Sequence, residues 1–231
     1  MEEPKITIGI PCYNQAQYLT EAIESVLAQT LKPYEIVVCN DGSPDETRYV
    51  ARQYSEIKYI EQVNKGLASA RNTILMNSSG DYVLFLDADD KLLPNCLQRI
   101  ADTITDNPDA DVIAPSFKCF GINDREVILM PNPQLEDFKP ADFKTPMNRI
   151  GYASAIRRSA ILAVGGYSPK MTWGWEDYAL WIGLLNKGCK IVTIPEVLWL
   201  YRTKEESMIT EANRHASELM TQIHKDYPHI F

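Results

Sequence analysis

The N-terminal part of the chain alternates strand-length apolar segments with amphipathic ones. Strands are predicted at residues 5–10, 35–39, 57–61 and 82–86. Between them, residues 15–29 and 66–77 carry apolar side chains at helical spacing, and a further helix start follows the turn at 40–44. The segment 35–39 is apolar throughout, as in a parallel strand buried on both faces. This order predicts an α/β fold with a parallel sheet and right-handed crossovers.

The rest of the chain has a less regular pattern. Helices are predicted at 94–106, 158–164, 176–188 and 211–226. Strands are predicted at 111–117, 127–130, 150–157, 190–194 and 197–202. The polar, proline-bearing segment 131–150 suits a loop over a site. No linker or repeat interrupts the sequence, so we expect one domain over 1–231, with the regular half ending near residue 90.

Composition narrows the choice of partners and compartment. A net charge of −8 leaves no surplus of basic residues to displace counterions, which excludes a nucleic-acid backbone as the main partner. The apolar runs fall well short of the ~20 residues that span a bilayer, and no secretory signal is visible. The five cysteines are scattered and form no CxxC or Cys/His cluster, which predicts a reducing cytoplasm rather than a disulfide or zinc framework.

Unusual polar sequences follow three of the predicted strands. They are Pro11-Cys12-Tyr13-Asn14, Asn40-Asp41-Gly42-Ser43 and Asp87-Ala88-Asp89-Asp90. In an open parallel sheet, ligands bind beyond the carboxyl ends of the strands, so all three should meet at one edge. Neither a dinucleotide fingerprint nor a P-loop is present. A bound phosphate must therefore be held by something else, and a divalent cation is the natural candidate.

The pair Asp87 and Asp89 suits that cation. Carboxylate oxygens are the ligands that Mg²⁺ and Mn²⁺ prefer, and Mg²⁺ is commonly held by one or two carboxylates plus substrate phosphates. The alternative is a solvated acidic turn that caps the helix at residue 94. An isolated DxD sequence favours that alternative, because short motifs have a high false-positive rate. The other motifs of the chain reverse the balance.

Five motifs in order carry a resemblance to a known family. They are the three strand-end sequences, Asn64-Lys65-Gly66-Leu67-Ala68-Ser69-Ala70-Arg71-Asn72, and Trp173-Gly174-Trp175-Glu176-Asp177. Together they resemble the family 2 inverting glycosyltransferases of the GT-A fold, from residue 5 to about residue 207. The resemblance implies a Rossmann-like, mostly parallel sheet flanked by helices, with a smaller mixed second half. It also divides the domain into a nucleotide-binding half, to about residue 90, and an acceptor half that ends in the C-terminal helix.

The resemblance also implies roles for residues of the nucleotide half. Asp41 resembles the carboxylate that accepts N3–H of a uracil-like base, and Tyr13 the ring that stacks on the base. Arg71 resembles the basic residue near base and phosphates. Asp87 resembles the ribose contact and Asp89 the metal ligand, with Asp87 as its companion. The nucleotide-binding set is completed by Pro11, Asn14, Asn64, Gly66 and Ala88.

In the second half, Asp177 resembles the catalytic base, with Glu176 beside it to orient the acceptor or the backbone. A carboxylate near the nucleophile can take the proton of an attacking hydroxyl, and a base opposite the leaving group predicts inversion. Trp173 and Trp175 suit stacking on an acceptor sugar. Structural alternatives stay open for each motif: Tyr13 and the tryptophans as packing, Arg71 in a surface ion pair, Glu176-Asp177 as a helix start.

Two positions depart from the family pattern. Asn40 stands where many members have Asp. Many members also carry Tyr-Arg-x-His near the end, whereas this chain has Tyr201-Arg202-Thr203-Lys204. A protonated lysine has no lone pair and cannot replace a histidine ligand. Lys204 and Arg202 are therefore expected to contact the diphosphate, and the metal to be held more weakly.

The sequence thus predicts a metal-dependent glycosyltransferase of the hexosyltransferase type. Its expected partners are a nucleotide-sugar donor, most simply a UDP-sugar with Mn²⁺ or Mg²⁺, and a saccharide or lipid-linked saccharide acceptor. Cell-surface polysaccharide or glycolipid synthesis is expected by analogy, in the cytoplasm and peripherally at the inner face of the membrane. A sugar nucleotidyltransferase is the first alternative, although residues 11–16 lack the expected Gly-rich basic loop. A catalytically silent sugar-nucleotide-binding protein is the second.

Overall fold

The computed structural model describes residues 3–138, 149–205 and 207–230. The first half contains a parallel sheet with the strand order β3-β2-β1-β4. Its elements are β1 (Ile6–Cys12), α1 (Ala16–Leu27), β2 (Glu35–Asn40), α2 (Thr47–Ala51), β3 (Ile57–Glu61), α3 (Leu67–Asn77) and β4 (Tyr82–Phe85). Every residue of β1 and β4 is buried, because helices cover both faces of the sheet. The predicted α/β architecture is confirmed.

The second half extends this sheet with strands of mixed direction. Its elements are β5 (Lys91–Leu92), α4 (Cys96–Asp106), β6 (Val112–Gly121), β7 (Arg125–Val127), the 3-10 helix η1 (Leu135–Phe138), β8 (Ala155–Arg157), α5 (Arg158–Ala163), α6 (Glu176–Asn186), β9 (Ile191–Thr203), α7 (Met208–Arg214) and α8 (Ala216–Asp226). Strand β8 lies between β4 and β6 and runs antiparallel to both, whereas β9 runs parallel to β6. The predicted mixed second half is therefore confirmed.

Two predictions for this half are wrong in detail. The strands expected at 190–194 and 197–202 form one strand, β9, because a bulge accommodates Pro195 instead of ending the strand. Proline has no N–H to give to a ladder, and the register with β6 shifts at Ser116. The single tail helix expected at 211–226 is two helices, α7 and α8, with His215 between them.

Smaller differences concern the middle of the chain. Strand β8 covers only the end of the segment predicted at 150–157, and β7 precedes most of the predicted strand 127–130. The loop predicted at 131–150 contains η1, and its part at 139–148 lies outside the described residues.

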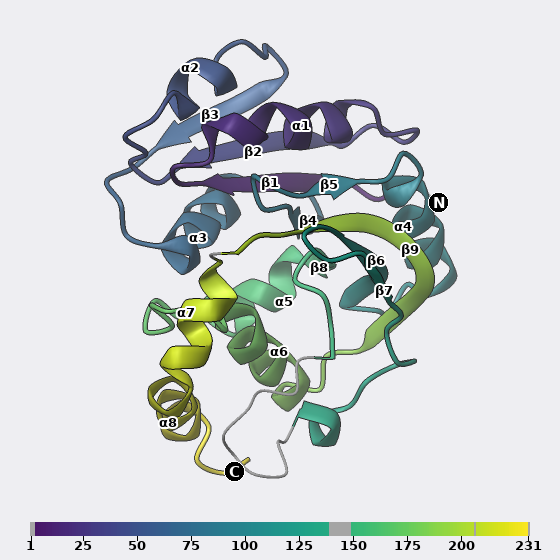
Figure 1. Cartoon of the computed structure of the whole chain (residues 1–231). Coiled ribbons are helices and arrows are strands. Elements are labelled where there is room, and N and C mark those ends of the chain that lie inside the picture. Colours follow the sequence, from purple (N-terminus) through teal and green to yellow (C-terminus); the bar gives the residue numbers. More distant parts are fainter. Residues whose placement is uncertain (1–2, 139–148, 206, 231) are drawn as a thin grey trace.

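Helices cover the two faces of the sheet in two apolar clusters. Helices α1, α2 and α4 pack on one face, while α3, α5 and α6 pack on the other, where α8 joins the same cluster. In Figure 1, the strongly curved β9 connects the sheet with the side of the molecule that holds α6, α7 and α8. This arrangement brings the chain after β9 back to the carboxyl ends of β1 and β4.

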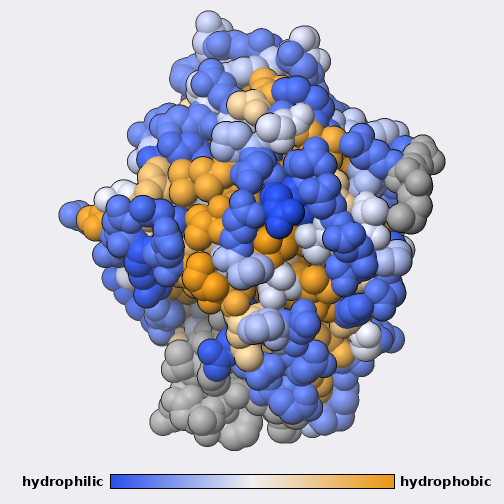
Figure 2. Space-filling model, turned by 90° about the vertical axis from the view of Figure 1, so that its right-hand side faces the viewer, coloured by the Kyte–Doolittle hydropathy of each residue, from blue (hydrophilic) through white to orange (hydrophobic). Residues whose placement is uncertain are grey.

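The surface of the right-hand side of that view is mostly polar. Figure 2 shows apolar residues that reach this face between polar ones, near the middle of the molecule. Within the ranges that the structure describes, no helix is both long and apolar enough to cross a membrane.

A buried cluster of charges connects the two halves. Arg71 of α3 is 1% exposed, and its Nη2 lies 2.8 Å from Asp87 Oδ1, just after β4. Its Nη1 forms a second ion pair with Glu176 at the start of α6. The guanidinium also lies 5.2 Å and 5.3 Å from the ring centres of Tyr152 and Tyr167. One side chain thus holds the end of β4, helix α3 and helix α6 together.

The ionisation of this cluster depends on Arg71. Burial raises the pKa of Asp87 to about 6, and the nearby guanidinium opposes that rise. Burial likewise raises the pKa of Glu176, again opposed by Arg71. Burial works against the charge of Arg71 as well, but the two carboxylates hold its pKa well above the ordinary value. Without the guanidinium, both carboxylates would lose the cation that keeps them charged in a buried place.

We predict that Arg71→Ala lowers the free energy of unfolding by about 3–5 kcal/mol, because removing one partner strands buried charges. The measurement is urea denaturation at pH 8, with Arg48→Ala as the matched control. Arg48 pairs with Glu61 on the surface, where solvent screens the pair and its loss changes stability little. At pH 5 the loss for Arg71→Ala should be smaller, because the stranded carboxylates then take up protons. Equal stability of the two variants would contradict a central role for Arg71.

Candidate active site

A pocket of about 680 Å³ opens at the carboxyl ends of β1, β2 and β4. The start of α3, the end of β9 and helix α7 complete its walls. Ten of the residues expected from the sequence line it: Pro11, Tyr13, Asp41, Asn64, Gly66, Asp87, Ala88, Asp89, Arg202 and Lys204. The three strand-end sequences therefore meet at one site. Six others are not among its lining residues: Asn14, Arg71, Trp173, Trp175, Glu176 and Asp177.

The wall expected to hold a base contains Tyr13 and Asp41. Tyr13 is 49% exposed, so its ring is available to the pocket and is not part of the core. Neighbouring Asn14 has a left-handed backbone with φ 53°, which asparagine tolerates, and its N–H donates to Ser43 Oγ at 3.1 Å. Asn14 thereby joins the ends of β1 and β2 behind the aromatic ring.

Asp41 fixes the loop that faces Tyr13. Its Oδ1 accepts hydrogen bonds from Gln62 Nε2 at 2.7 Å and from the N–H of Lys65 at 2.9 Å. Its Oδ2 accepts from the N–H of Gly66 at 2.8 Å. Gly66 precedes α3 with φ 86°, a conformation that favours glycine. A carboxylate has about four lone-pair sites, so Asp41 keeps capacity for one further donor.

The turn after Asp41 depends on a glycine. Gly42 has φ 70°, and a Cβ at this position would lie 2.8 Å from the backbone N of Asn64. The neighbouring Asn40 uses its side chain inside the turn, where Oδ1 accepts from the N–H of Ser43 at 2.8 Å. The amide oxygen of Asn40 thus accepts the same hydrogen bond in this turn that an aspartate carboxylate at position 40 could accept.

The acidic sequence after β4 is bound to the end of β9. The side-chain Nε of Arg202 donates to the carbonyl of Asp89 at 2.8 Å, and the backbone N–H of Arg202 donates to Asp90 Oδ1 at 2.6 Å. Asp90 also accepts from the hydroxyl of Tyr152, and burial raises its pKa. Lys204 places its Nζ 2.6 Å from Asp89 Oδ2. Arg202, near the end of β9, and Lys204, just after it, therefore both contact the acidic sequence 87–90.

The donor atoms limit how a divalent cation could bind. Within the described ranges, no cluster of three or more Asp, Glu, His or Cys side chains exists that could hold one. Asp87 lines the pocket but gives one oxygen to Arg71, and Asp90 is buried. Asp89 also lines the pocket, where it pairs with Lys204. These residues fit a site in which one or two carboxylates would hold the cation and phosphate oxygens of a bound ligand would complete its coordination.

Arg71 lies behind the pocket and not in it. It is buried between Asp87 and Glu176, so its predicted place near the base and phosphates is one step behind the lining residues. The alternative of a surface ion pair is wrong, because both of its partners hold it in the interior. It acts on the pocket through Asp87, whose carboxylate it fixes.

Glu176 and Asp177 begin α6, as predicted. Glu176 is buried on Arg71, whereas Asp177 is half-buried and its Oδ1 accepts from the N–H of Tyr178 at 2.7 Å. The helix dipole also favours a carboxylate in the first turn of α6. The neighbouring Glu176 pairs with Arg71, and Arg71 in turn binds Asp87, which lines the pocket. Asp177 therefore lies near the pocket without lining it.

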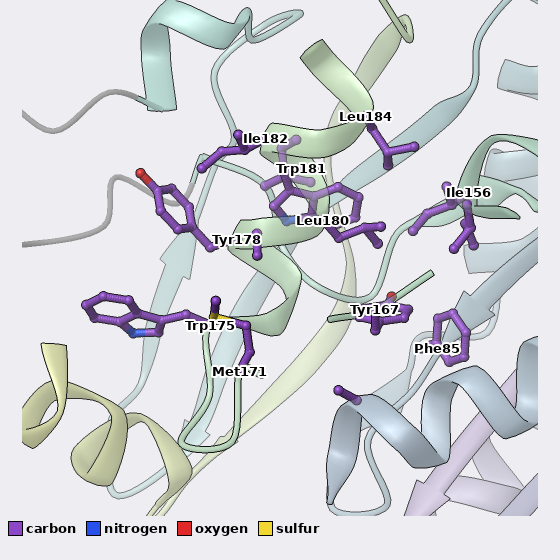
Figure 3. Packing of buried hydrophobic residues seen from close by; sticks show 14 of the residues in the cluster. Phe85, Ile156, Tyr167, Met171, Trp175, Tyr178, Leu180, Trp181, Ile182 and Leu184 are labelled. Atoms are coloured by element: carbon purple, nitrogen blue, oxygen red, sulfur yellow. The ribbon is translucent and has the colours of Figure 1, made fainter. Parts of the chain in front are cut away.

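The two tryptophans differ in exposure. Trp175 is 5% exposed and lies in the apolar cluster with Met171 and Tyr178, at the start of α6 in Figure 3. Its buried ring contradicts the prediction that it stacks on an acceptor sugar. Trp173 is 38% exposed and stacks on His215 with ring centres 4.1 Å apart. Of the two, Trp173 keeps a surface that a ligand can reach.

Several pocket residues were not expected from the sequence. Helix α7 and the residue before it contribute Ser207, Met208, Thr210, Glu211 and Arg214. Tyr152 supports the floor, where its hydroxyl accepts from the N–H of Asp87 at 3.2 Å. Gln62 supports Asp41. None of them belongs to a short motif, although Gln62 lies two residues before the 64–72 sequence and could have been included with it.

Known proteins resemble this chain in both sequence and structure. Its residues 7–165 match the model of Glycosyl transferase family 2. Glycosyltransferase GlyA of Streptococcus pneumoniae is 40% identical over 122 residues, which is 51% of this chain and 17% of GlyA. EpsE of Bacillus subtilis is 30% identical over 216 residues, covering 88% of this chain and 74% of EpsE. The chain therefore spans a small part of one relative and most of the other.

Among solved structures, S. aureus TarS 1-349 in complex with UDP-GlcNAc superposes with a TM-score of 0.80. The two sequences are 19% identical, and the match covers 97% of this chain and 67% of TarS 1-349. This likeness confirms the GT-A fold. Together with the family match over more than half of the chain, it leads to one conclusion: this chain belongs to glycosyl transferase family 2.

Proposed function

We propose that the chain transfers a sugar from a UDP-sugar to a hydroxyl acceptor, with inversion at the anomeric carbon. The observation that carries the proposal is the pocket that joins Tyr13, Asp41 and Asp89, with Asp177 close by at the start of α6. The TarS neighbour binds UDP-GlcNAc, which supports a uridine nucleotide as the donor. Family membership favours a glycosyltransferase over a nucleotidyltransferase.

The nucleotide is assigned to the first half and the acceptor to the second. Tyr13 stacks on the base, the remaining acceptor capacity of Asp41 takes N3–H, and Asp87, oriented by Arg71, holds the ribose. Arg202 and Lys204 lie where a diphosphate would need positive charge. Asp177 takes the proton of the acceptor hydroxyl as the new bond forms, and Glu176 fixes the start of α6 through Arg71.

A divalent cation, Mn²⁺ or Mg²⁺, would be held by Asp89, with Asp87 beside it, and would neutralise the charge that develops on the leaving diphosphate. The acceptor is a saccharide or lipid-linked saccharide in cell-surface polysaccharide or glycolipid synthesis, and Trp173 is the exposed ring that can stack on it. The five free cysteines suit a reducing cytoplasm, where the enzyme would work peripherally at the inner face of the membrane.

The base pocket generates a prediction about the nucleotide. A carboxylate accepts from N3–H of uracil or thymine but meets a bare acceptor at N3 of cytosine. We expect CDP to bind about 10–100-fold more weakly than UDP in calorimetry, since an unmatched buried polar group costs about 1–3 kcal/mol. Asp41→Ala should remove this discrimination and weaken donor binding more than it slows turnover.

Gln62→Ala is the control for that variant, because it removes one contact that holds Asp41 but keeps the carboxylate. It should retain the preference for UDP. Equal binding of CDP and UDP by the unmodified chain would overturn the assignment of Asp41.

The metal assignment generates a second prediction. EDTA should abolish transfer, and Mn²⁺ or Mg²⁺ should restore it, as measured by UDP release with donor and acceptor present. Asp89→Ala should behave like the chelated enzyme even in excess metal, because its pocket-facing carboxylate is gone. Full activity in EDTA would show instead that the basic residues stabilise the leaving group alone.

The third prediction concerns the base. A general base contributes about 10²–10⁴-fold, so Asp177→Asn should lower turnover by about that factor while UDP affinity and folding persist. Added Mn²⁺ should not restore the activity. Glu176→Gln serves as the neighbouring comparison and should lose stability in urea denaturation, because it weakens the buried pair with Arg71. Near-normal turnover of Asp177→Asn with inactive but folded Glu176→Gln would assign the base to Glu176.

A further inference from the structure

Lys204 occupies a position that the proposed metal would need. Its Nζ lies 2.6 Å from Asp89 Oδ2 and 3.4 Å from Gln15 Oε1, and 5.2 Å from the ring centre of Tyr18. Both members of the ion pair face the pocket, with 25% of the lysine side chain and 18% of the aspartate side chain exposed. An ammonium group therefore already neutralises the carboxylate best placed for a cation.

The three lining cations are held in different ways. Arg202 donates to the carbonyl of Asp89 through its Nε, pairs with Glu21 through its Nη2, and lies between the rings of Tyr18 and Phe120. Arg214 pairs with Glu211 of the same helix, and 70% of its side chain is exposed. Lysine carries a compact charge on a flexible four-carbon stem, so Lys204 can turn to a ligand when its contacts with Asp89 and Gln15 break. Among the described lining residues, Lys204 is thus the cation that both pairs with the Asp89 carboxylate and can turn to a ligand.

A diphosphate entering this pocket would bring more negative charge than Asp89 offers. The ammonium can donate to phosphate oxygens and leave Asp89 to a divalent cation, whereas both cations cannot sit on the same carboxylate oxygen. Charge-assisted hydrogen bonds to ionised oxygens are stronger than bonds between neutral groups, so one such bond adds measurably to the affinity for a nucleotide. In the structure the ammonium of Lys204 pairs with Asp89 at 2.6 Å. A bound diphosphate would offer it a second anionic partner.

We propose that Lys204 is a resident cation of the donor site, bound to Asp89 in the empty enzyme and to the diphosphate in the complex. The inference rests on the proposed function and adds two properties to it. A nucleoside diphosphate binds without any divalent cation, although transfer still needs one. A divalent cation alone binds the empty enzyme weakly, because Lys204 competes with it for Asp89.

Calorimetry can test both properties without reference to turnover. UDP is titrated into the unmodified chain, Lys204→Gln and Lys190→Gln, in EDTA and in Mn²⁺, and MnCl₂ alone is titrated in a third series. Lys190 is the matched control: it loses the same charge, but its Nζ pairs with Asp109 at the opposite end of β9. Thermal melting of each variant confirms that it is folded.

In EDTA, Lys204→Gln should bind UDP at least about 10-fold more weakly than the unmodified chain, as expected for one lost charge-assisted hydrogen bond. The same variant should bind Mn²⁺ alone more tightly, and Lys190→Gln should match the unmodified chain in every titration. The ratio of UDP affinity in Mn²⁺ to that in EDTA should consequently rise in Lys204→Gln.

Unchanged UDP affinity of Lys204→Gln in EDTA would overturn the inference, as would unchanged Mn²⁺ affinity. UDP binding by the unmodified chain in Mn²⁺ but not in EDTA would overturn the inference and leave the proposed function intact. If the folded, unmodified chain binds UDP in neither buffer, the proposed function itself fails.

Discussion

The ion pairs of Arg71 with Asp87 and Glu176 are the constraint on which the rest of the site depends. They bring together the end of β4, which carries the acidic motif, and the start of α6, which carries Asp177. These segments are far apart in the sequence and belong to different halves of the domain. Burial makes the cluster expensive to break, since each carboxylate relies on the same guanidinium for its charge. The relative position of the acidic motif and Asp177 is thus set in the interior and not by surface loops.

The first half could be predicted closely because its signals are local. Apolar strands such as β2 end in turns rich in Asn, Asp and Gly, and parallel pairing then determines where the polar residues meet. The roles that needed long-range knowledge could not be predicted. Arginine is seldom buried, so nothing in the sequence showed that Arg71 would have two partners 16 and 105 positions away.

Predictions for the second half failed where tertiary contacts override local preference. A proline usually ends a strand, but the bulge in β9 lets Pro195 stay within it. The aromatic residues around Gly174 indicated a sugar platform, yet Trp175 is buried in the apolar cluster at the start of α6. The predicted single tail helix is two helices, and the first of them, α7, contributes residues to the wall of the pocket.

The bulge in β9 also sets which side chains the strand presents to the acidic motif. Beside β6, the residues Pro195, Glu196 and Leu198 have no partner in the register. Three is an odd number, so the alternation of faces beyond the bulge is inverted relative to an unbroken ladder. Arg202 and, two residues on, Lys204 consequently reach Asp89. The bulge therefore determines which side chains of β9 lie on the face of the acidic motif. Removing one residue from the bulge would keep the strand but turn Arg202 and Lys204 to the opposite face and bring their sequence neighbours to Asp89.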